Sequence, residues 1–553
     1  MKGYEYLSAI FNAYGTTHMF FQEVSMNKTI HYAKEKYGIE SILAHTEGAA
    51  GYMADGYARV TGKPGVVAAQ SVGAANLVGG IQDASFAKVP VIALTGRKPA
   101  SHQYKNAYQE ANHRALYSGV TKFNAEINDP QELPFLVRQC YKQSVTGKPG
   151  PVHLDLQGFD GLDSEMSDIN EEFCAEPVYG NYPPFRPSAE APLIANAADL
   201  IGEAKKPLIV IGRGAYMSDA GEAIEKLAKK ADIPFVTTPD GKTVVDESDE
   251  YWAGIVGQYG MDCGNKAAMA ADLVIFIGTQ ASDQTTCDWN APAHTTKVIQ
   301  IDIEPSELCK NYPDSVGLPG DAAIVTGQLA DAAAEKKNPE WRAEVKAMVE
   351  DTLNEQNAVK AIEGEPIRTE YLCKVVGDVL PDDAILVSDT GFGAIWSATM
   401  IRMKKSQSYI RAAGSLGWAY PASLGAKCGA PERPVVCFIG DGGFYYHLPE
   451  METAMRNGIN TVTVINNNST YSQCTGCLTF GYSDAPEKGV EKITFETMNF
   501  AKVAEDFGVL GIRVEKSEDI APAIEKALAA GRPAVVEVVT ADAATCQPLP
   551  AIK

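Results

Sequence analysis

Short apolar runs alternate with stretches of helical periodicity along most of the chain. The clearest runs cover residues 65–69, 89–95, 206–212, 273–277 and 434–439. Runs of this length and composition are typical of strands that are buried on both faces, and the helices between them predict crossover connections. The pattern therefore predicts an α/β protein that is built from doubly wound parallel sheets.

Two polar segments divide this pattern into three blocks. Residues 177–192 are rich in proline, and residues 336–366 form a charged helical stretch with little apolar periodicity. A chain of 553 residues is also long for a single hydrophobic core. We therefore expect three domains, at residues 1–170, 190–335 and 367–541.

Composition and charge narrow the class of protein. The chain is 45% hydrophobic and 21% charged, and its net charge is −22. These values indicate a globular protein and argue against binding to nucleic acids or anionic membranes. No apolar run is long enough to predict a membrane span. The N-terminus has no signal-peptide pattern and the eleven cysteines are scattered, which predicts a reduced, cytoplasmic protein. The one Cys-x-x-Cys pair, Cys474 and Cys477, is interpreted as two ordinary loop thiols.

Two polar loops near the C-terminal end each follow a buried apolar run. Gly440–Gly443 follows the run 434–439, and Asn466–Asn468 follows a second run. Because parallel strands of one βαβ unit end at the same edge of a sheet, Asp441 and Asn468 are predicted to lie side by side. Their oxygens suit Mg²⁺, and the glycine turn lets backbone N–H groups approach an anion. The two loops together predict a magnesium-diphosphate site.

This pair of loops resembles the diphosphate motif of thiamine-diphosphate (ThDP) enzymes, which runs from Gly-Asp-Gly to Asn-Asn. The resemblance implies that Asp441, Asn468 and the backbone carbonyl of Thr470 bind Mg²⁺. It also implies that Gly442 and Gly443 contact the diphosphate.

The segment from His45 to Val66 resembles the pyrimidine-binding segment of the acetolactate synthase-like branch of these enzymes. Glu47 begins a predicted helix, where a carboxylate is favoured by the helix dipole even without a catalytic role. Asp55 and the Gly-Tyr-Ala-Arg that follows it complete the match. The resemblance implies that Glu47 is the catalytic glutamate, whose protonated carboxyl group binds the aminopyrimidine ring. A pocket of low dielectric would keep that proton in place by raising the pKa.

Three further stretches resemble the same family. Residues 414–421 imply that Gly414 and Leu416 clamp the pyrimidine and that Leu416 supports the bent cofactor. Residues 389–393 imply a second diphosphate loop with Gly391 and Phe392. Residues 107–111 imply that Gln109 lines the active site and takes part in catalysis.

By these motifs the chain is identified as a member of the acetolactate synthase-like (pyruvate oxidase/decarboxylase-type) family of ThDP enzymes. The resemblance implies a pyrimidine-binding, a central and a diphosphate-binding domain. It implies a Mg²⁺/ThDP-dependent lyase or carboligase that acts on 2-oxo acids or related ketones through an enamine. Family members build each site between two subunits, so that a homodimer is the minimum and a homotetramer is expected.

Three departures from the family pattern bear on the reaction. Phe20–Asn27 replaces a glycine-rich loop and introduces Glu23, which is either an acid/base or substrate contact or a surface glutamate. Ser71–Asn76 replaces a Gly-Pro-Gly stretch. Gln280 and Gln284 stand where FAD-binding members carry arginine, and glutamine lacks the charged fork that binds phosphate. FAD is therefore doubtful and is left out, and acetolactate as the product stays open.

Two alternative functions follow from other features. The stretch Tyr445–His447 resembles cyclohexane-1,2-dione hydrolase, which keeps a ThDP-dependent hydrolase or lyase of 1,2-diketones open. A non-catalytic partner protein with the ThDP fold is the other alternative, and the intact Glu47, Asp441 and Asn468 argue against it. A nucleotide-binding oxidoreductase is disfavoured, because Gly212–Gly214 does not extend to GxGxxG.

Overall fold

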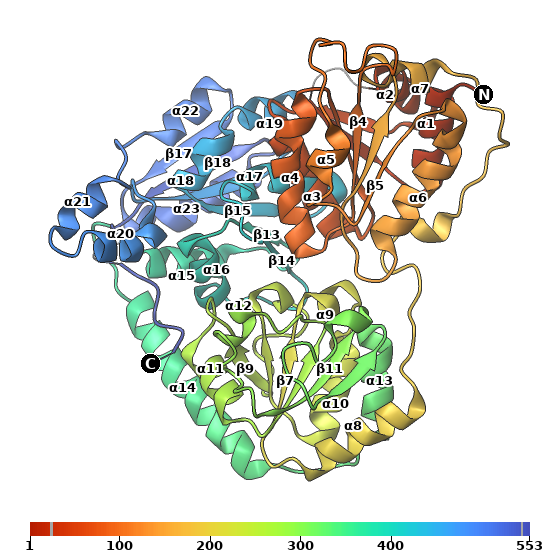
Figure 1. Cartoon of the computed structure of the whole chain (residues 1–553). Coiled ribbons are helices and arrows are strands. Elements are labelled where there is room, and N and C mark those ends of the chain that lie inside the picture. Colours follow the sequence, from red (N-terminus) through yellow and green to blue (C-terminus); the bar gives the residue numbers. More distant parts are fainter. Residues whose placement is uncertain (23–25, 543–545, 553) are drawn as a thin grey trace.

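The computed structural model describes residues 1–22, 26–542 and 546–552, and it has three domains (Figure 1). Each domain is a six-stranded, all-parallel sheet with helices on its faces. This arrangement confirms the predicted fold class. Within the described ranges, no helix is long and apolar enough to cross a membrane.

The N-terminal domain has the strand order β2-β1-β3-β4-β6-β5. Its strands are β1 His18–Phe21, β2 Glu40–Leu43, β3 Gly65–Gln70, β4 Val91–Gly96, β5 Phe123–Glu126 and β6 Val152–Leu156. Its helices are α1 Gly3–Ala13, α2 Asn27–Tyr37, α3 Glu47–Thr61, α4 Gly73–Ala87, α5 His113–Tyr117, α6 Leu133–Val145 and α7 Leu162–Met166.

The central domain has the strand order β12-β11-β10-β7-β8-β9, which is the order of dinucleotide-binding folds. Its strands are β7 Pro207–Ile211, β8 Phe235–Thr237, β9 Trp252–Ile255, β10 Leu273–Ile277, β11 Lys297–Asp302 and β12 Val316–Pro319. Its helices are α8 Ala191–Glu203, α9 Arg213–Met217, α10 Gly221–Ala231, α11 Asp262–Ala270, α12 Asp283–Thr286 and α13 Ala322–Ala332.

A long helix, α14 (Pro339–Lys360), joins the central domain to the C-terminal one. Trp341 and Val345 are its buried apolar anchors on the central domain. The Trp341 indole N–H donates to the carbonyl of Pro207 over 2.8 Å. The charged stretch of the sequence therefore covers the central sheet on one side and faces solvent on the other.

The C-terminal domain repeats the topology of the first, with the order β14-β13-β15-β16-β18-β17. Its strands are β13 Ile385–Ser388, β14 Ser408–Arg411, β15 Val435–Gly440, β16 Val462–Asn467, β17 Leu510–Val514 and β18 Ala534–Val539. Its helices are α15 Thr369–Val379, α16 Phe392–Met400, α17 Ala419–Gly429, α18 Asp441–Phe444, α19 Glu450–Asn457, α20 Thr475–Gly481, α21 Pro486–Glu491, α22 Phe500–Asp506 and α23 Ile520–Ala529. Helices α20 and α21 project from the body of this domain (Figure 1).

The N-terminal and C-terminal domains share one hydrophobic core, in which α3 packs against α17. Glycines bring the two helix backbones together. A Cβ atom on Gly56 would lie 2.0 Å from the carbonyl oxygen of Ala422, and one on Gly425 would lie 1.8 Å from that of Met53. Any side chain at either glycine would force the helices apart.

Candidate active site

A cavity at the carboxyl edge of the C-terminal sheet collects most of the residues predicted to bind cofactor and metal. It lies where β13, β15 and β16 end, as expected for a ligand site in a parallel sheet. Its lining includes the predicted residues Gly391, Phe392, Leu416, Asp441, Gly442, Gly443, Asn468 and Thr470. The structure therefore brings these side chains and turns together, although they come from four separate loops.

Asp441 is a buried acidic group of this cavity with an unmet bonding need. Asp441 is only 2% exposed, and its Oδ2 atom has no hydrogen-bond partner among the described residues. Burial raises the pKa of Asp441 to about 7, although backbone N–H groups of neighbouring residues oppose the shift. A buried carboxylate oxygen without a partner is costly, and a bound cation would satisfy it.

The predicted partners of Asp441 lie on the loop that follows β16. The Asn468 side-chain amide donates to the Ser472 hydroxyl over 2.8 Å, a bond that does not use its carbonyl oxygen. Thr470 is held in an isolated bridge to Thr494, and its hydroxyl donates to the carbonyl of Ile493 over 3.1 Å. These contacts fix the loop beside Asp441 and leave oxygen ligands of the kind that Mg²⁺ prefers.

The glycines of the cavity are required by space. A Cβ atom on Gly443 would lie 2.1 Å from Asp389 Oδ2, and one on Gly442 would lie 2.5 Å from the Tyr471 ring. Gly391 has a φ of +71°, which disfavours other residues. Glycine at 442 and 443 thus lets the turn pack closely against Tyr471 and Asp389, while both residues still line the cavity.

Asp389 links this cradle to the loop that carries Leu416. It accepts the Gly417 N–H at 2.9 Å through Oδ2, while Oδ1 has no partner among the described residues. Burial raises the pKa of Asp389 to about 7, against the backbone hydrogen bonds that it accepts. The sequence placed Asp389 in a diphosphate loop but gave no indication of this bracing role.

Gly414 does not line the cavity, and its loop is held by the N-terminal domain instead. The carboxylate of Asp83 on α4 accepts the N–H groups of Ala413, Gly414 and Ser415 at 2.9, 3.1 and 2.9 Å. Arg59 Nη2 donates to the same carboxylate over 2.9 Å. The loop predicted to clamp the pyrimidine is therefore fastened by a residue from another domain.

A buried ion network surrounds that contact. Arg59 donates from Nε to Asp55 over 2.7 Å, and the Trp418 indole N–H donates to Asp55 over 2.8 Å. The Arg59 guanidinium also lies 4.3 Å from the centre of the Trp418 ring. The Asp55 and Arg59 spacing was visible in the sequence as an i,i+4 pair, but Asp83 carried no local signal.

Glu47 is the first residue of α3, whose cap is Thr46. Its Oε2 atom accepts from the Asn76 side chain over 3.2 Å, and a Cβ atom on Gly73 would lie 2.4 Å from Oε1. Glu450 of the C-terminal domain accepts the His45 N–H at 3.0 Å and so anchors the preceding loop. The described residues that line the diphosphate cavity include none from the N-terminal domain, so Glu47 is not part of it.

The other two residues predicted to be catalytic are Gln109 and Glu23. Gln109 is half-buried and has a φ of +59°, in a loop whose Tyr104 and Tyr108 are 97% and 81% exposed. Gln109 does not line the diphosphate cavity. It does not line the second cavity, described next, either. Glu23 lies outside the described residues.

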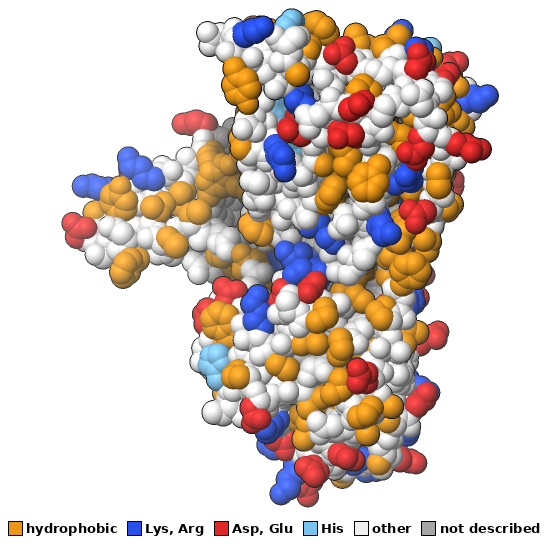
Figure 2. All heavy atoms as spheres, turned by 45° about the vertical axis from the view of Figure 1, so that its right-hand side comes forward, with side chains coloured by type: hydrophobic (Ala, Val, Ile, Leu, Met, Phe, Trp, Pro, Cys, Tyr) orange, Lys and Arg blue, Asp and Glu red, His pale blue; other side chains and the backbone are white. Residues whose placement is uncertain are grey.

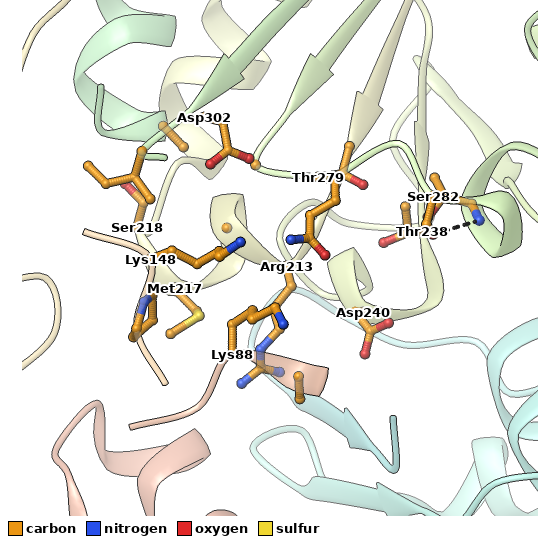
Figure 3. A pocket seen from close by; sticks show the side chains of 18 of the residues that line it. Lys88, Lys148, Arg213, Met217, Ser218, Thr238, Asp240, Thr279, Ser282 and Asp302 are labelled. Atoms are coloured by element: carbon orange, nitrogen blue, oxygen red, sulfur yellow. Dashed lines mark hydrogen bonds between the residues drawn. The ribbon is translucent and has the colours of Figure 1, made fainter. Parts of the chain in front are cut away.

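A second cavity lies at the carboxyl edge of the central sheet, where all three domains meet (Figure 3). Lys88 and Lys148 reach it from the N-terminal domain, and Arg213 from α9. In the space-filling view, Lys and Arg side chains gather at the boundary between the upper and lower parts of the molecule (Figure 2). Gln284 lines this cavity and accepts from Arg411 over 3.2 Å, so that its amide oxygen is already in use.

His447 belongs to the stretch behind the diketone-hydrolase alternative. It is 8% exposed, and its ring meets that of Tyr52 edge to face at 5.7 Å. Burial lowers the pKa of His447 to about 4, so the ring is neutral at neutral pH. It does not line the diphosphate cavity.

The three parallel-sheet domains and the cavity around Asp441 fit an enzyme of the thiamine pyrophosphate (ThDP) class, and comparisons with family models show that class. Models of the N-terminal TPP binding domain, the central domain and the C-terminal TPP binding domain of thiamine pyrophosphate enzymes match residues 1–116, 194–329 and 389–538. The chain therefore belongs to the thiamine pyrophosphate enzyme family, in its acetolactate synthase-like branch.

The particular branch rests on relatives that match along nearly the whole chain. A probable acetolactate synthase large subunit of Methanocaldococcus jannaschii is 32% identical over 512 residues, which is 90% of this chain and 85% of that protein. An acetolactate synthase large subunit of Corynebacterium glutamicum is 31% identical over 529 residues, 92% of this chain and 82% of that protein. The predicted family is thereby confirmed, and these comparisons favour neither alternative function.

Proposed function

We propose that this chain is a Mg²⁺- and ThDP-dependent carboligase or lyase whose donor is a 2-oxo acid or a related ketone. The observation that supports it most is the buried Oδ2 atom of Asp441 beside a glycine turn, which has no hydrogen-bond partner among the described residues. A divalent cation bound there would neutralise the carboxylate and bridge it to a diphosphate. The names of the similar acetolactate synthase large subunits support the reaction class.

Each group in the cavity has a separate part in holding the cofactor. Asp441, Asn468 and the Thr470 carbonyl would bind Mg²⁺, and Gly442 and Gly443 would admit the diphosphate. Leu416 would support the cofactor between its two rings. When bound, ThDP supplies the carbanion chemistry that side chains lack, whereas the protein binds, orients and shields it.

Glu47 would hold a proton on its carboxyl group at the pyrimidine ring and pass it to and from the ring nitrogen. Asn76 and Gly73 favour one orientation of that carboxyl group, because Asn76 bonds Oε2 and only a glycine leaves room for Oε1. Fixing a proton donor in one geometry lowers the entropy cost of each transfer.

The separation of Glu47 from the diphosphate cavity supports a site that is shared between two chains. Within one chain, the described lining of that cavity comes from the C-terminal part alone. We therefore propose a homodimer at minimum, and a homotetramer as its expected assembly, in which each chain lends Glu47 to its partner. The proposed cofactors do not include FAD, because Gln280 and Gln284 do not present a charged fork to phosphate.

The test combines binding and product analysis. Protein with Mg²⁺ and ThDP is mixed with pyruvate, other 2-oxo acids and 1,2-diketones, and the products are followed by NMR. Release of CO₂ with an acyloin or acetolactate product supports the proposal. Hydrolysis of a diketone, with no ligated product and no turnover of any 2-oxo acid, overturns it in favour of a hydrolase.

The role of Glu47 is tested separately by Glu47→Gln. This variant should bind ThDP in calorimetry with affinity close to that of the wild type, yet lose about a hundredfold or more in kcat. The exposed Glu35 on α2 supplies the control Glu35→Gln, which should change neither quantity. Undiminished turnover of Glu47→Gln would refute the assignment.

A further inference from the structure

A buried histidine ties down the turn that faces Glu47. His113 begins the short helix α5 and is 1% exposed. Its Nε2 atom lies 2.8 Å from the carbonyl oxygen of Ser71, and its Nδ1 atom lies 3.0 Å from Asp155 Oδ1 on β6. The ring therefore spans the distance between a strand of the sheet and the turn before α4.

The two contacts favour a hydrogen on each nitrogen of the ring. A carbonyl oxygen only accepts, so Nε2 carries a hydrogen toward Ser71. The Asp155 carboxylate, which also accepts from Thr95 over 2.7 Å, calls for a second hydrogen on Nδ1. Burial alone lowers the pKa of His113, but the hydrogen bonds to Asp155 and Ser71 outweigh it and the pKa is raised. Both contacts thus favour the protonated ring, which donates in both directions.

The turn that His113 holds needs such a tie. Ser71 is 1% exposed and has a φ of +39°, which is unfavourable for a residue with a side chain. Its hydroxyl donates to Asp160, and the Tyr117 hydroxyl of α5 donates to the Ala74 carbonyl over 2.9 Å. Side-chain hydrogen bonds therefore hold the backbone in a conformation that it does not prefer.

The same turn sets the surroundings of Glu47. Gly73 lies two residues after Ser71, and its lack of a side chain leaves room for Glu47 Oε1. Asn76, one turn further along α4, donates to Oε2. A displaced Ser71 would shift both of these contacts on one carboxyl group.

We propose that His113 is a positioning residue, which holds the Ser71 carbonyl and thereby fixes Gly73 and Asn76 against Glu47. The proposal rests on the role of Glu47 in the proposed function. His113 itself touches neither Glu47 nor the reacting atoms, and its effect passes through the backbone of residues 71–76.

Two amide variants separate the two hydrogen bonds of the ring. In His113→Gln the amide nitrogen takes the place of Nε2 and still donates to Ser71. In His113→Asn the amide takes the place of Nδ1 and reaches only Asp155. We expect His113→Asn to lower kcat at least about tenfold with little change in KM for the donor, and His113→Gln to lower it less than about threefold. The exposed His31 on α2 supplies the control His31→Gln.

Hydrogen exchange of the cofactor-free protein gives a readout that does not depend on turnover. The amides of residues 71–76 should exchange faster in His113→Asn than in His113→Gln, while the rest of β3 and α4 stays protected. If His113→Asn does not fold, Tyr117→Phe removes the other hydrogen bond from α5 to the same turn. Like His113→Asn, that variant should show faster exchange of the amides of residues 71–76 and a lower kcat.

Equal turnover and equal exchange in the two amide variants would overturn the positioning role. Faster exchange in His113→Asn with kcat unchanged would overturn it too, because the turn would then not govern Glu47. Failure of the proposed function looks different, since Glu47→Gln would retain full turnover while the exchange of residues 71–76 still separated the His113 variants.

Discussion

At the residue scale, the carboxylate of Asp441 is placed where a charge is costly unless a cation accompanies it. It is 2% exposed, one of its oxygens has no partner in the part of the chain that the structure describes, and burial raises its pKa to about 7. Near neutral pH the proton and the metal therefore compete for the same oxygen. This competition makes cofactor loading sensitive to pH.

We expect the affinity for Mg²⁺, measured with ThDP in excess, to fall about tenfold for each pH unit below about 7, because a proton must leave Asp441 before the metal binds. Calorimetry between pH 6 and 8 checks this slope. In Asp441→Asn the affinity should be weak at every pH and the slope attributable to this residue should vanish. An unchanged slope in the variant would assign the pH dependence to another group.

Linkage gives a second prediction for the same residue. The folded pKa of Asp441 lies above its ordinary value of 3.8, so its contribution to stability is present at low pH and is lost as the pH rises toward about 7. The melting temperature of cofactor-free protein should therefore fall from pH 5.5 to pH 8 by more than that of Asp441→Asn. Adding Mg²⁺ and ThDP at pH 8 should raise the melting temperature of the wild-type protein again, but not that of Asp441→Asn.

The buried Asp83 is expected to matter for stability as much as for the site. Asp83→Ala removes the acceptor of three backbone N–H groups and leaves Arg59 with one carboxylate fewer. Breaking a buried ion pair on one side costs about 3–5 kcal/mol. Urea unfolding should show that loss, whereas Asp331→Ala, which removes an exposed ion pair with Lys226, should leave the midpoint unchanged.

The sequence was informative about residues whose partners are local and uninformative about the others. Asp441 and Asn468 follow consecutive strands, so their meeting followed from parallel topology alone. Asp83 meets Gly414 across 331 residues, and His113 meets Ser71 from another loop. Such pairs leave no periodicity or spacing in the sequence, because the tertiary fold alone brings them together.

At the element scale, the contact between α3 and α17 depends on glycines that a pattern of apolar residues does not reveal. Periodicity predicted buried strands and parallel sheets, but not that α3 packs against a helix of the third domain. The shared strand order of the two outer sheets was equally hidden, since different side chains fill the two sheets. Sequence periodicity reports which face of an element is buried, not what buries it.

Gly425→Ala tests this helix contact. The added methyl group would lie 1.8 Å from the Met53 carbonyl, so the helices must separate, and overpacking of this kind costs about 1–3 kcal/mol. Gly79→Ala on α4 is the matched control, because nothing lies within 4 Å of its Cβ position. That control should gain about 0.5–1 kcal/mol from helix propensity. Denaturant unfolding of both variants measures the difference.

At the scale of the whole molecule, the proposed sharing of the site predicts complementation. Glu47→Gln and Asp441→Asn should each have little activity alone. Mixed dimers that combine one chain of each contain one site with both substitutions and one with neither. Co-refolded mixtures should therefore regain about a quarter of the wild-type activity. Activity that stays absent in mixtures shown to contain mixed dimers would place Glu47 and Asp441 in one chain.

The packing of α3 on α17 also has a consequence for how the chain folds as it is made. The face of α3 around Gly56 leaves the ribosome long before its partner at Ala422 exists. At typical synthesis rates that interval is roughly 20–70 s. One face of the central sheet can close against α11 and α14 within that time, but the first domain must wait with one apolar helix face uncovered. That uncovered face makes the nascent first domain prone to aggregation until the residues around Ala422 have been made.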